Sequence, residues 1–93
     1  MYHITSYTRQ QAAKYGLSVK PSQVRGKKIS VYKGDDYLGS VGAIGYLDYP
    51  SFKREQGPDV AEEHRRRYHD RHKHENGYNT MYSRSWLART LLW

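Results

Sequence analysis

The chain has 93 residues, no cysteine and a formal net charge of +7, from 16 Lys and Arg residues against 9 Asp and Glu residues. Its length suits one small domain, residues 1–93, with a thin core. The lack of cysteine excludes a disulfide framework and a thiolate metal site. No apolar run approaches the ~20 residues of a membrane span, and residues 1–5 lack the features of a signal peptide. By elimination, we expect a protein that is not secreted, has no membrane partner and resides in the cytoplasm, the nucleus or a virus particle.

Positive charge is concentrated in the first third of the chain. Residues 1–33 contain seven basic residues and no acidic residue, whereas residues 34–93 contain nine of each. Such asymmetry indicates a polyanion-binding segment, because every phosphate that a Lys or Arg neutralises releases condensed counterions. The alternative is a basic surface that only aids solubility. The residues that we predict to contact a polyanion are Lys20, Arg25, Lys27, Lys28 and Lys33, with Arg65, Arg66 and Arg71 as additions.

The N-terminal segment, residues 1–27, is predicted to hold one helix and one extended stretch. Residues 5–15 contain good helix formers after a Thr-Ser start, and Gly16 is a suitable C-terminal stop. Residues 18–27 contain Pro, Ser and Gly without apolar periodicity, which predicts a connector or an extended basic arm. This arm is our first choice for a segment that lies along a phosphate backbone.

The next segment predicts a β-hairpin. Residues 28–33 alternate in character, and residues 37–41 form a second β-prone run after a Gly-Asp-Asp turn. A third short strand can extend this hairpin. Residues 46–57 are aromatic and rich in turn formers, and Pro50 is placed to open a short helical turn.

Residues 58–75 predict the main helix. Pro58 suits its first turn, acidic residues follow, and basic residues gather at the other end, as the helix dipole favours. We predict an α+β fold in which a β-hairpin, extended to three strands if a third is present, packs on one main helix with short flanking helices. The expected contact layer is Ile29, Val31, Leu38, Val41, Ile44, Val60, His64, Tyr68, Trp86 and Leu87.

The C-terminal tail, residues 78–93, contains both tryptophans of the chain. A charged domain of this size cannot leave so much apolar surface in water without inviting association. The tail therefore either folds back onto the hairpin and the main helix, within residues 28–93, or docks into a partner. The candidate partner anchors are Tyr82, Trp86, Leu91 and Trp93.

The histidines do not predict a reaction. His64 and His72 are two helical turns apart, and Tyr68 at the position between them is a poor zinc ligand. A metal-dependent nuclease of the ββα kind stays an alternative, but it needs a general-base histidine near the hairpin, where this sequence has none. We interpret Asp48 as a turn residue. We predict no catalytic residue, no metal site, no cofactor and no small-molecule substrate.

Several motifs together carry a family resemblance. In order they are Lys20-Pro21-Ser22, Lys27-Lys28-Ile29-x-Val31-Tyr32-Lys33, the run from Val41 to Pro50, Arg65-Arg66-x-Tyr68-x-x-Arg71-His72 and Leu91-Leu92-Trp93. With them the chain resembles a family of small proteins of unknown function encoded by nucleocytoplasmic large DNA viruses, with more distant phage relatives. The resemblance spans nearly the whole chain and implies a viral origin, without catalytic residues. Residues 76–79 depart from the family pattern, which is richer in Lys there, and this puts a basic-tail role in doubt.

Three functions follow from these observations, in order of preference. The first is a non-enzymatic, virion-associated minor capsid or accessory protein that docks on a polyanionic surface, such as an acidic surface of viral structural proteins. The second is a nucleic-acid-binding accessory or packaging protein. The third is the metal-dependent nuclease. The partner is thus predicted to be nucleic acid or an acidic protein surface.

Overall fold

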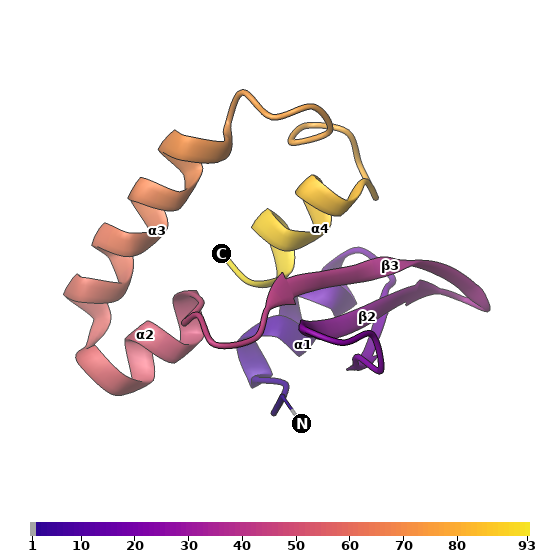
Figure 1. The fold of residues 1–93 in the computed structure, drawn as a ribbon, viewed down its shortest axis with the longest axis horizontal. Coiled ribbons are helices and arrows are strands. Elements are labelled where there is room, and N and C mark those ends of the chain that lie inside the picture. Colours follow the sequence, from indigo (N-terminus) through magenta and orange to yellow (C-terminus); the bar gives the residue numbers. More distant parts are fainter. Residues whose placement is uncertain (1) are drawn as a thin grey trace.

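The computed structural model describes residues 2–93 and has an α+β fold, as the sequence predicts (Figure 1). None of the helices within these residues has the length and apolar character that a bilayer span requires. The elements, in chain order, are α1 (Ser6–Lys14), β1 (Ser18–Pro21), β2 (Lys27–Lys33), β3 (Asp36–Ala43), α2 (Tyr49–Gln56), α3 (Pro58–His72) and α4 (Arg84–Leu91).

The strands form one antiparallel sheet in the order β1-β2-β3. The predicted hairpin corresponds to β2 and β3, and its ladder shifts register between Val31 and Tyr32. The expected connector or arm over residues 18–27 is wrong in its first part, because Ser18–Pro21 pairs with β2 as the third strand. Only Val19 of this strand is buried, so the segment has too little apolar alternation to be recognised locally.

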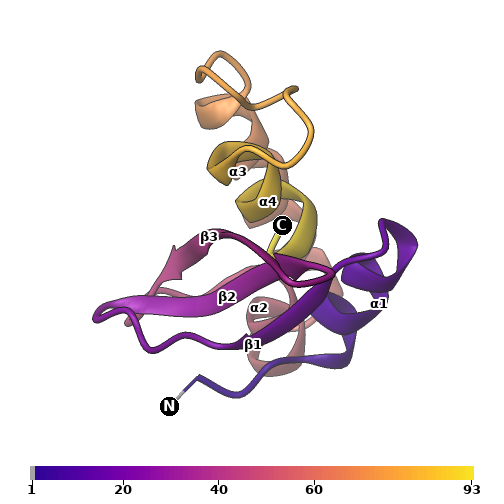
Figure 2. The same ribbon diagram turned by 90° about the vertical axis from the view of Figure 1, so that its right-hand side faces the viewer.

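One face of the sheet is apolar and packs against α4 and α1. Figure 2 shows α4 lying over the sheet, with α1 beside it. Helix α4 contacts β3 and α1, and α1 contacts β1. The C-terminal tail therefore folds back on the sheet, which decides between the two alternatives left by the sequence. The buried apolar residues of this core are Ile4, Ala12, Leu17, Val19, Ile29, Val31, Val41, Trp86, Leu87, Leu91 and Leu92.

Helices α2 and α3 pack against each other at one side of the sheet (Figure 1). Gly57, with φ of 94°, joins them directly, because its positive φ turns the chain from one helix into the next. The main helix is thus supported mostly by α2, while α4 covers the sheet. Two residues of the expected contact layer are exposed for this reason: Ile44 by 49% and Val60 by 37%.

Helix α3 is also attached to the rest of the protein by aromatic contacts. The Trp93 ring stacks on Tyr68 at 4.6 Å between centroids with an interplanar angle of 6°. The Phe52 ring of α2 stacks on His64 at 3.8 Å. These contacts place His64 and Tyr68 in an aromatic cluster between α2, α3 and the end of α4, and not under the sheet.

Candidate functional site

The second face of the sheet is polar. Side chains alternate between the two faces of a strand, and cross-strand partners share a face. Lys20 pairs with Ser30, and Ser30 with Ser40, so these three residues lie opposite the apolar face that contains Val31. Tyr32 and Tyr37 form the next cross-strand pair on the polar face.

A lysine and two tyrosines form a row on this face. The Lys20 ammonium lies 5.3 Å from the centroid of the Tyr32 ring. The rings of Tyr32 and Tyr37 lie 5.5 Å apart and are tilted by 52°. The Tyr37 side chain is 51% exposed, so an aromatic surface remains open to a ligand. Tyr32 and Tyr37 are cross-strand partners directly after the register shift between Val31 and Tyr32.

Three serine hydroxyls lie beside this row. Ser30 and Ser40 are 2.7 Å apart between their Oγ atoms, and Ser22 Oγ lies within 3.3 Å of both. The Tyr37 hydroxyl also bonds Ser40. A hollow of about 420 Å³ next to them is lined by seven residues, none of them acidic. The polar face therefore combines a cation, aromatic rings and neutral hydroxyls, without a carboxylate to repel an anion.

The predicted polyanion contacts near the sheet do not all share this face. Lys20 lies on it, and Arg25 lies in the adjoining β1–β2 loop. Strand alternation places the side chains of Lys27 and Lys33 on the opposite face of β2. The Lys33 ammonium lies 4.8 Å from the centroid of the Tyr82 ring. Within residues 2–93, none of these four cations has a carboxylate within 4 Å.

Lys28 is wrongly predicted as a polyanion contact. Its side chain is 6% exposed, and its ammonium donates hydrogen bonds to the Asp48 carboxylate at 3.0 Å and to the Tyr46 carbonyl. It cannot reach a phosphate without breaking this pair. Asp48 is more than a turn residue: it also accepts from the Ser51 N–H and so caps α2.

The three predicted contacts on α3 differ in their surroundings. Arg65 lies 3.7 Å from Glu62, and its guanidinium covers the Tyr49 ring at 4.8 Å. Arg66 pairs with Glu63 at 2.8 Å and with Asp70 at 3.6 Å. Their charges are thus largely balanced on their own helix. Arg71 has no acidic partner within 4 Å among residues 2–93, and it lines a cleft that shares no lining residue with the hollow of the polar face.

The four predicted partner anchors differ in how far they are buried. Trp86 is 5% exposed and Leu91 is 0% exposed, so both belong to the core and cannot serve as anchors. Tyr82 is half-buried and packs its ring 5.6 Å from that of Trp86. Trp93 is partly exposed and lines the cleft beside α3.

Three of the five histidines are engaged in local contacts. His64 stacks on Phe52, His72 bonds Glu75, and His69 bonds the Tyr78 hydroxyl. Burial lowers the pKa of His69, which favours its neutral form. No group of three or more potential metal ligands converges within residues 2–93.

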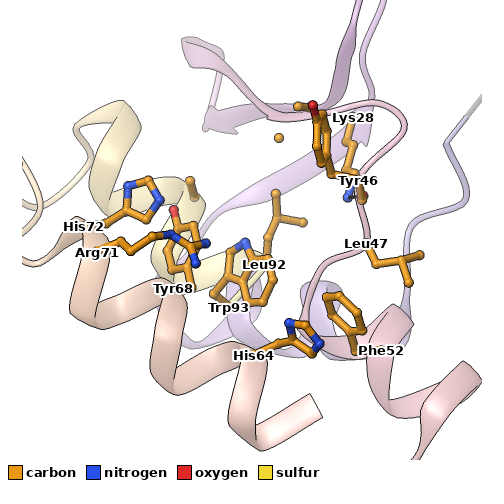
Figure 3. A pocket seen from close by; sticks show the side chains of 13 residues that line it. Lys28, Tyr46, Leu47, Phe52, His64, Tyr68, Arg71, His72, Leu92 and Trp93 are labelled. Atoms are coloured by element: carbon orange, nitrogen blue, oxygen red, sulfur yellow. Dashed lines mark hydrogen bonds between the residues drawn. The ribbon is translucent and has the colours of Figure 1, made fainter. Parts of the chain in front are cut away.

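The cleft between α3 and the β3–α2 loop has no counterpart in the sequence-based predictions. Figure 3 shows Tyr68 and Arg71 of α3 on one side of it and the loop that carries Tyr46 and Leu47 on the other. Its volume is about 440 Å³. The sequence did contain one signal: the run from Ile44 to Leu47 has three large apolar residues in a segment that pairs with no strand.

Comparison with known proteins identifies no relative of the chain. No family model matches the chain, and neither a curated protein nor a solved structure matches it. The arguments that follow rest on the surfaces described above.

Proposed function

We propose that the protein is a binding module that takes single-stranded nucleic acid on the polar face of its sheet. The row of Lys20, Tyr32 and Tyr37 carries this proposal. Stacking of bases on exposed aromatic side chains beside a basic groove is a common way to bind single strands without sequence preference. Tyr37 supplies the open ring, and Lys20 with Arg25 supplies charge for the backbone phosphates.

The open ring of Tyr37 favours a single strand over a duplex. The bases of a duplex are stacked on one another and present only their edges in the grooves, whereas Tyr37 is 51% exposed and offers its ring to the face of an unpaired base. Unpaired bases expose ring faces that can stack on Tyr37, beside a hollow of about 420 Å³ that Lys20 and Gln23 help to line. The Ser30 and Ser40 hydroxyls are buried and bonded to each other, so they support the face from within. The absence of acidic residues from residues 2–33 keeps the surroundings of Lys20 and Arg25 positive.

Fluorescence anisotropy of a labelled oligothymidylate, titrated with the protein at several NaCl concentrations, tests the proposal. We expect binding that weakens by about 0.7 log units per log unit of salt for each phosphate contacted. Tyr37→Ala should weaken binding by on the order of ten-fold, from the loss of one stacking platform. Lys20→Ala should weaken binding and also reduce the salt slope.

Matched variants make the result specific. Tyr46→Ala removes an exposed tyrosine outside the polar face, and Lys53→Ala removes an exposed lysine of α2. Both should bind like the original protein. Binding that does not respond to salt, or that Tyr46→Ala weakens as much as Tyr37→Ala does, would contradict the proposal.

A place in a virus particle remains a second part of the proposal, supported by the family resemblance and by the free cations around β2. A basic module of this size can bind nucleic acid inside a particle, or an acidic shell protein. Mass spectrometry of purified particles tests this part. A copy number tied to shell symmetry supports a minor capsid role, and absence from particles removes it.

A further inference from the structure

The cleft beside α3 is a second surface with different chemistry. One wall is formed by α3, with Tyr68 and Arg71, and the other by the β3–α2 loop, with Tyr46 and Leu47 (Figure 3). Trp93 lies between the walls. The apolar side chains of the loop are open to solvent: Tyr46 is 74% exposed and Leu47 is 36% exposed. An apolar surface held open between two walls suits a bound side chain of a partner.

The charged side chains that line the cleft are basic. Its described lining contains the cations Lys28 and Arg71 and no Asp or Glu. Two carboxylates lie close by, and each is already engaged: Asp48 by Lys28, and Glu75 by His72 and Ser85. Lys28 is neutralised by its pair. Arg71 is therefore the cation that remains free at the cleft, and it favours an acidic ligand.

The rings on the α3 side of the cleft are engaged in contacts within the protein. Tyr68 has Trp93 at 4.6 Å on one side and His72 at 4.1 Å in a second stacked contact. Phe52 and His64 stack on each other with an interplanar angle of 6°. Tyr46, on the loop, is the exposed ring of the lining, so a flat base finds few free faces on the α3 side. An aliphatic side chain needs only an apolar cavity.

We propose that this cleft binds an acidic peptide segment of a partner protein, with a large aliphatic side chain packed against Trp93 and a neighbouring carboxylate paired with Arg71. The cleft of about 440 Å³ has room for one or two side chains of the segment. This inference goes beyond nucleic-acid binding and does not depend on it, because the cleft and the polar face share neither Lys20 nor Tyr37. The protein would then join a nucleic acid on one surface to a protein on another.

Heteronuclear NMR of the full chain with two probe peptides tests this. The first is a short, end-capped peptide in which a leucine pair is flanked by aspartates, and the second has lysines in place of the aspartates. We expect the acidic peptide to shift the Trp93 indole N–H signal and to leave that of Trp86, which is 5% exposed, unchanged. The lysine peptide should bind about ten-fold more weakly or not at all.

Variants of Arg71 test whether its charge is responsible for the preference for the acidic peptide. Arg71→Ala should weaken the binding of the acidic peptide by about ten-fold. Arg71→Glu should reverse the preference, so that the lysine peptide binds more tightly than the acidic one. Arg67→Ala is the matched control, because Arg67 lies on the same helix, is exposed and lines no part of the cleft. It should leave peptide binding unchanged.

Several results would overturn the inference. Equal binding of both peptides, shifts that map to Tyr37 and not to Trp93, or an absence of shifts would each do so. A stronger shift of Trp93 by oligothymidylate than by the acidic peptide would make the cleft a nucleic-acid site instead. Loss of nucleic-acid binding on the polar face would leave these peptide results intact, so the two proposals fail separately.

Discussion

Lys28 and Asp48 form an ion pair inside the protein, with 3.0 Å between Nζ and Oδ2 and side chains only 6% and 1% exposed. The pair joins β2 to the start of α2, 20 residues further along the chain. Asp48 also accepts hydrogen bonds from the Tyr2 hydroxyl and the Ser51 N–H. One carboxylate thus holds the N-terminal segment, the sheet and α2 together, next to the cleft.

Removal of either partner should strongly destabilise the protein. Asp48→Ala leaves the Lys28 ammonium buried without its counter-charge, and we expect a loss of about 3–5 kcal/mol in the free energy of unfolding. Lys28→Met should also destabilise, because Asp48 loses one of its donors. The double variant should lose less than the sum of the single losses, since the two residues interact directly. Urea unfolding measures all three, and additive losses would show that the pair is not coupled.

The same pair predicts how stability depends on pH. Burial by itself raises the pKa of Asp48, but the hydrogen bonds from Tyr2, Ser51 and Lys28, with the charge of Lys28, outweigh it and hold the pKa below its usual value of 3.8. The unfolded chain therefore takes up this proton at higher pH than the folded protein does. The stabilisation is complete above the unfolded pKa and is lost as pH falls through the folded pKa.

Urea unfolding of the original protein and of Asp48→Asn, from neutral to acidic pH, isolates this contribution. The variant should be less stable at neutral pH, and the difference between the two proteins should shrink as pH falls below 3.8. Glu63 and Glu75, whose pKa values are also lowered, are present in both proteins and cancel in the comparison. A difference that stays constant with pH would mean that Asp48 acts through its shape alone.

The sequence predicted the parts of the fold that depend on local signals. Alternation and a Gly-Asp-Asp turn are sufficient for the hairpin, and Pro58 with the charge order of the following residues is sufficient for the main helix. Ser18–Pro21 was missed because its strand character comes from pairing with β2, and not from its own four residues.

The sequence was sufficient to predict which residue types form the candidate site, but not which face of the sheet each residue occupies. The basic residues around β2 were recognised, yet the alternation of strand residues sends Lys20 to one face and Lys33 to the other. Nothing in the local sequence distinguishes Lys28 from its neighbour Lys27, because the carboxylate that keeps Lys28 buried lies 20 residues away. The position of Tyr37 beside Tyr32 depends on the register shift of the β2–β3 ladder between Val31 and Tyr32, which the alternation of the strand residues does not predict.

The two tryptophans should differ in their contribution to stability. Trp86 is 5% exposed and packs against the rings of Tyr15 and Tyr82, so Trp86→Ala should cost about 3–5 kcal/mol. Trp93 is partly exposed, and its loss removes mainly the stacking on Tyr68, worth about 1 kcal/mol, along with part of its apolar burial. Thermal or urea unfolding of the two alanine variants checks the order. A greater loss for Trp93→Ala would indicate that the aromatic cluster of α3, and not the sheet core, dominates stability.

Gly42 of β3 lies directly against Leu92 of the C-terminal tail. Its φ is +87°, and a Cβ atom added there would lie 2.7 Å from Leu92 Cδ1 and 3.1 Å from Lys28 Cβ. Gly42→Ala therefore meets both backbone strain and a clash with buried side chains. Gly34 has φ of +60° and nothing within 4 Å of the same position, so Gly34→Ala bears the backbone strain alone.

Comparison of the two variants separates these effects. We expect Gly42→Ala to lose about 1–3 kcal/mol more than Gly34→Ala in urea unfolding, because overpacking of a buried site adds to the strain. Leu92→Ala removes the atom that clashes, but Leu92 is 1% exposed and its truncation is itself costly. Leu92→Ala should therefore cost less in the Gly42→Ala background than in the original protein. Equal losses for the two glycine variants would mean that α4 and its C-terminal residues can move away from the sheet at little cost. The cleft that they border would then be adjustable in width.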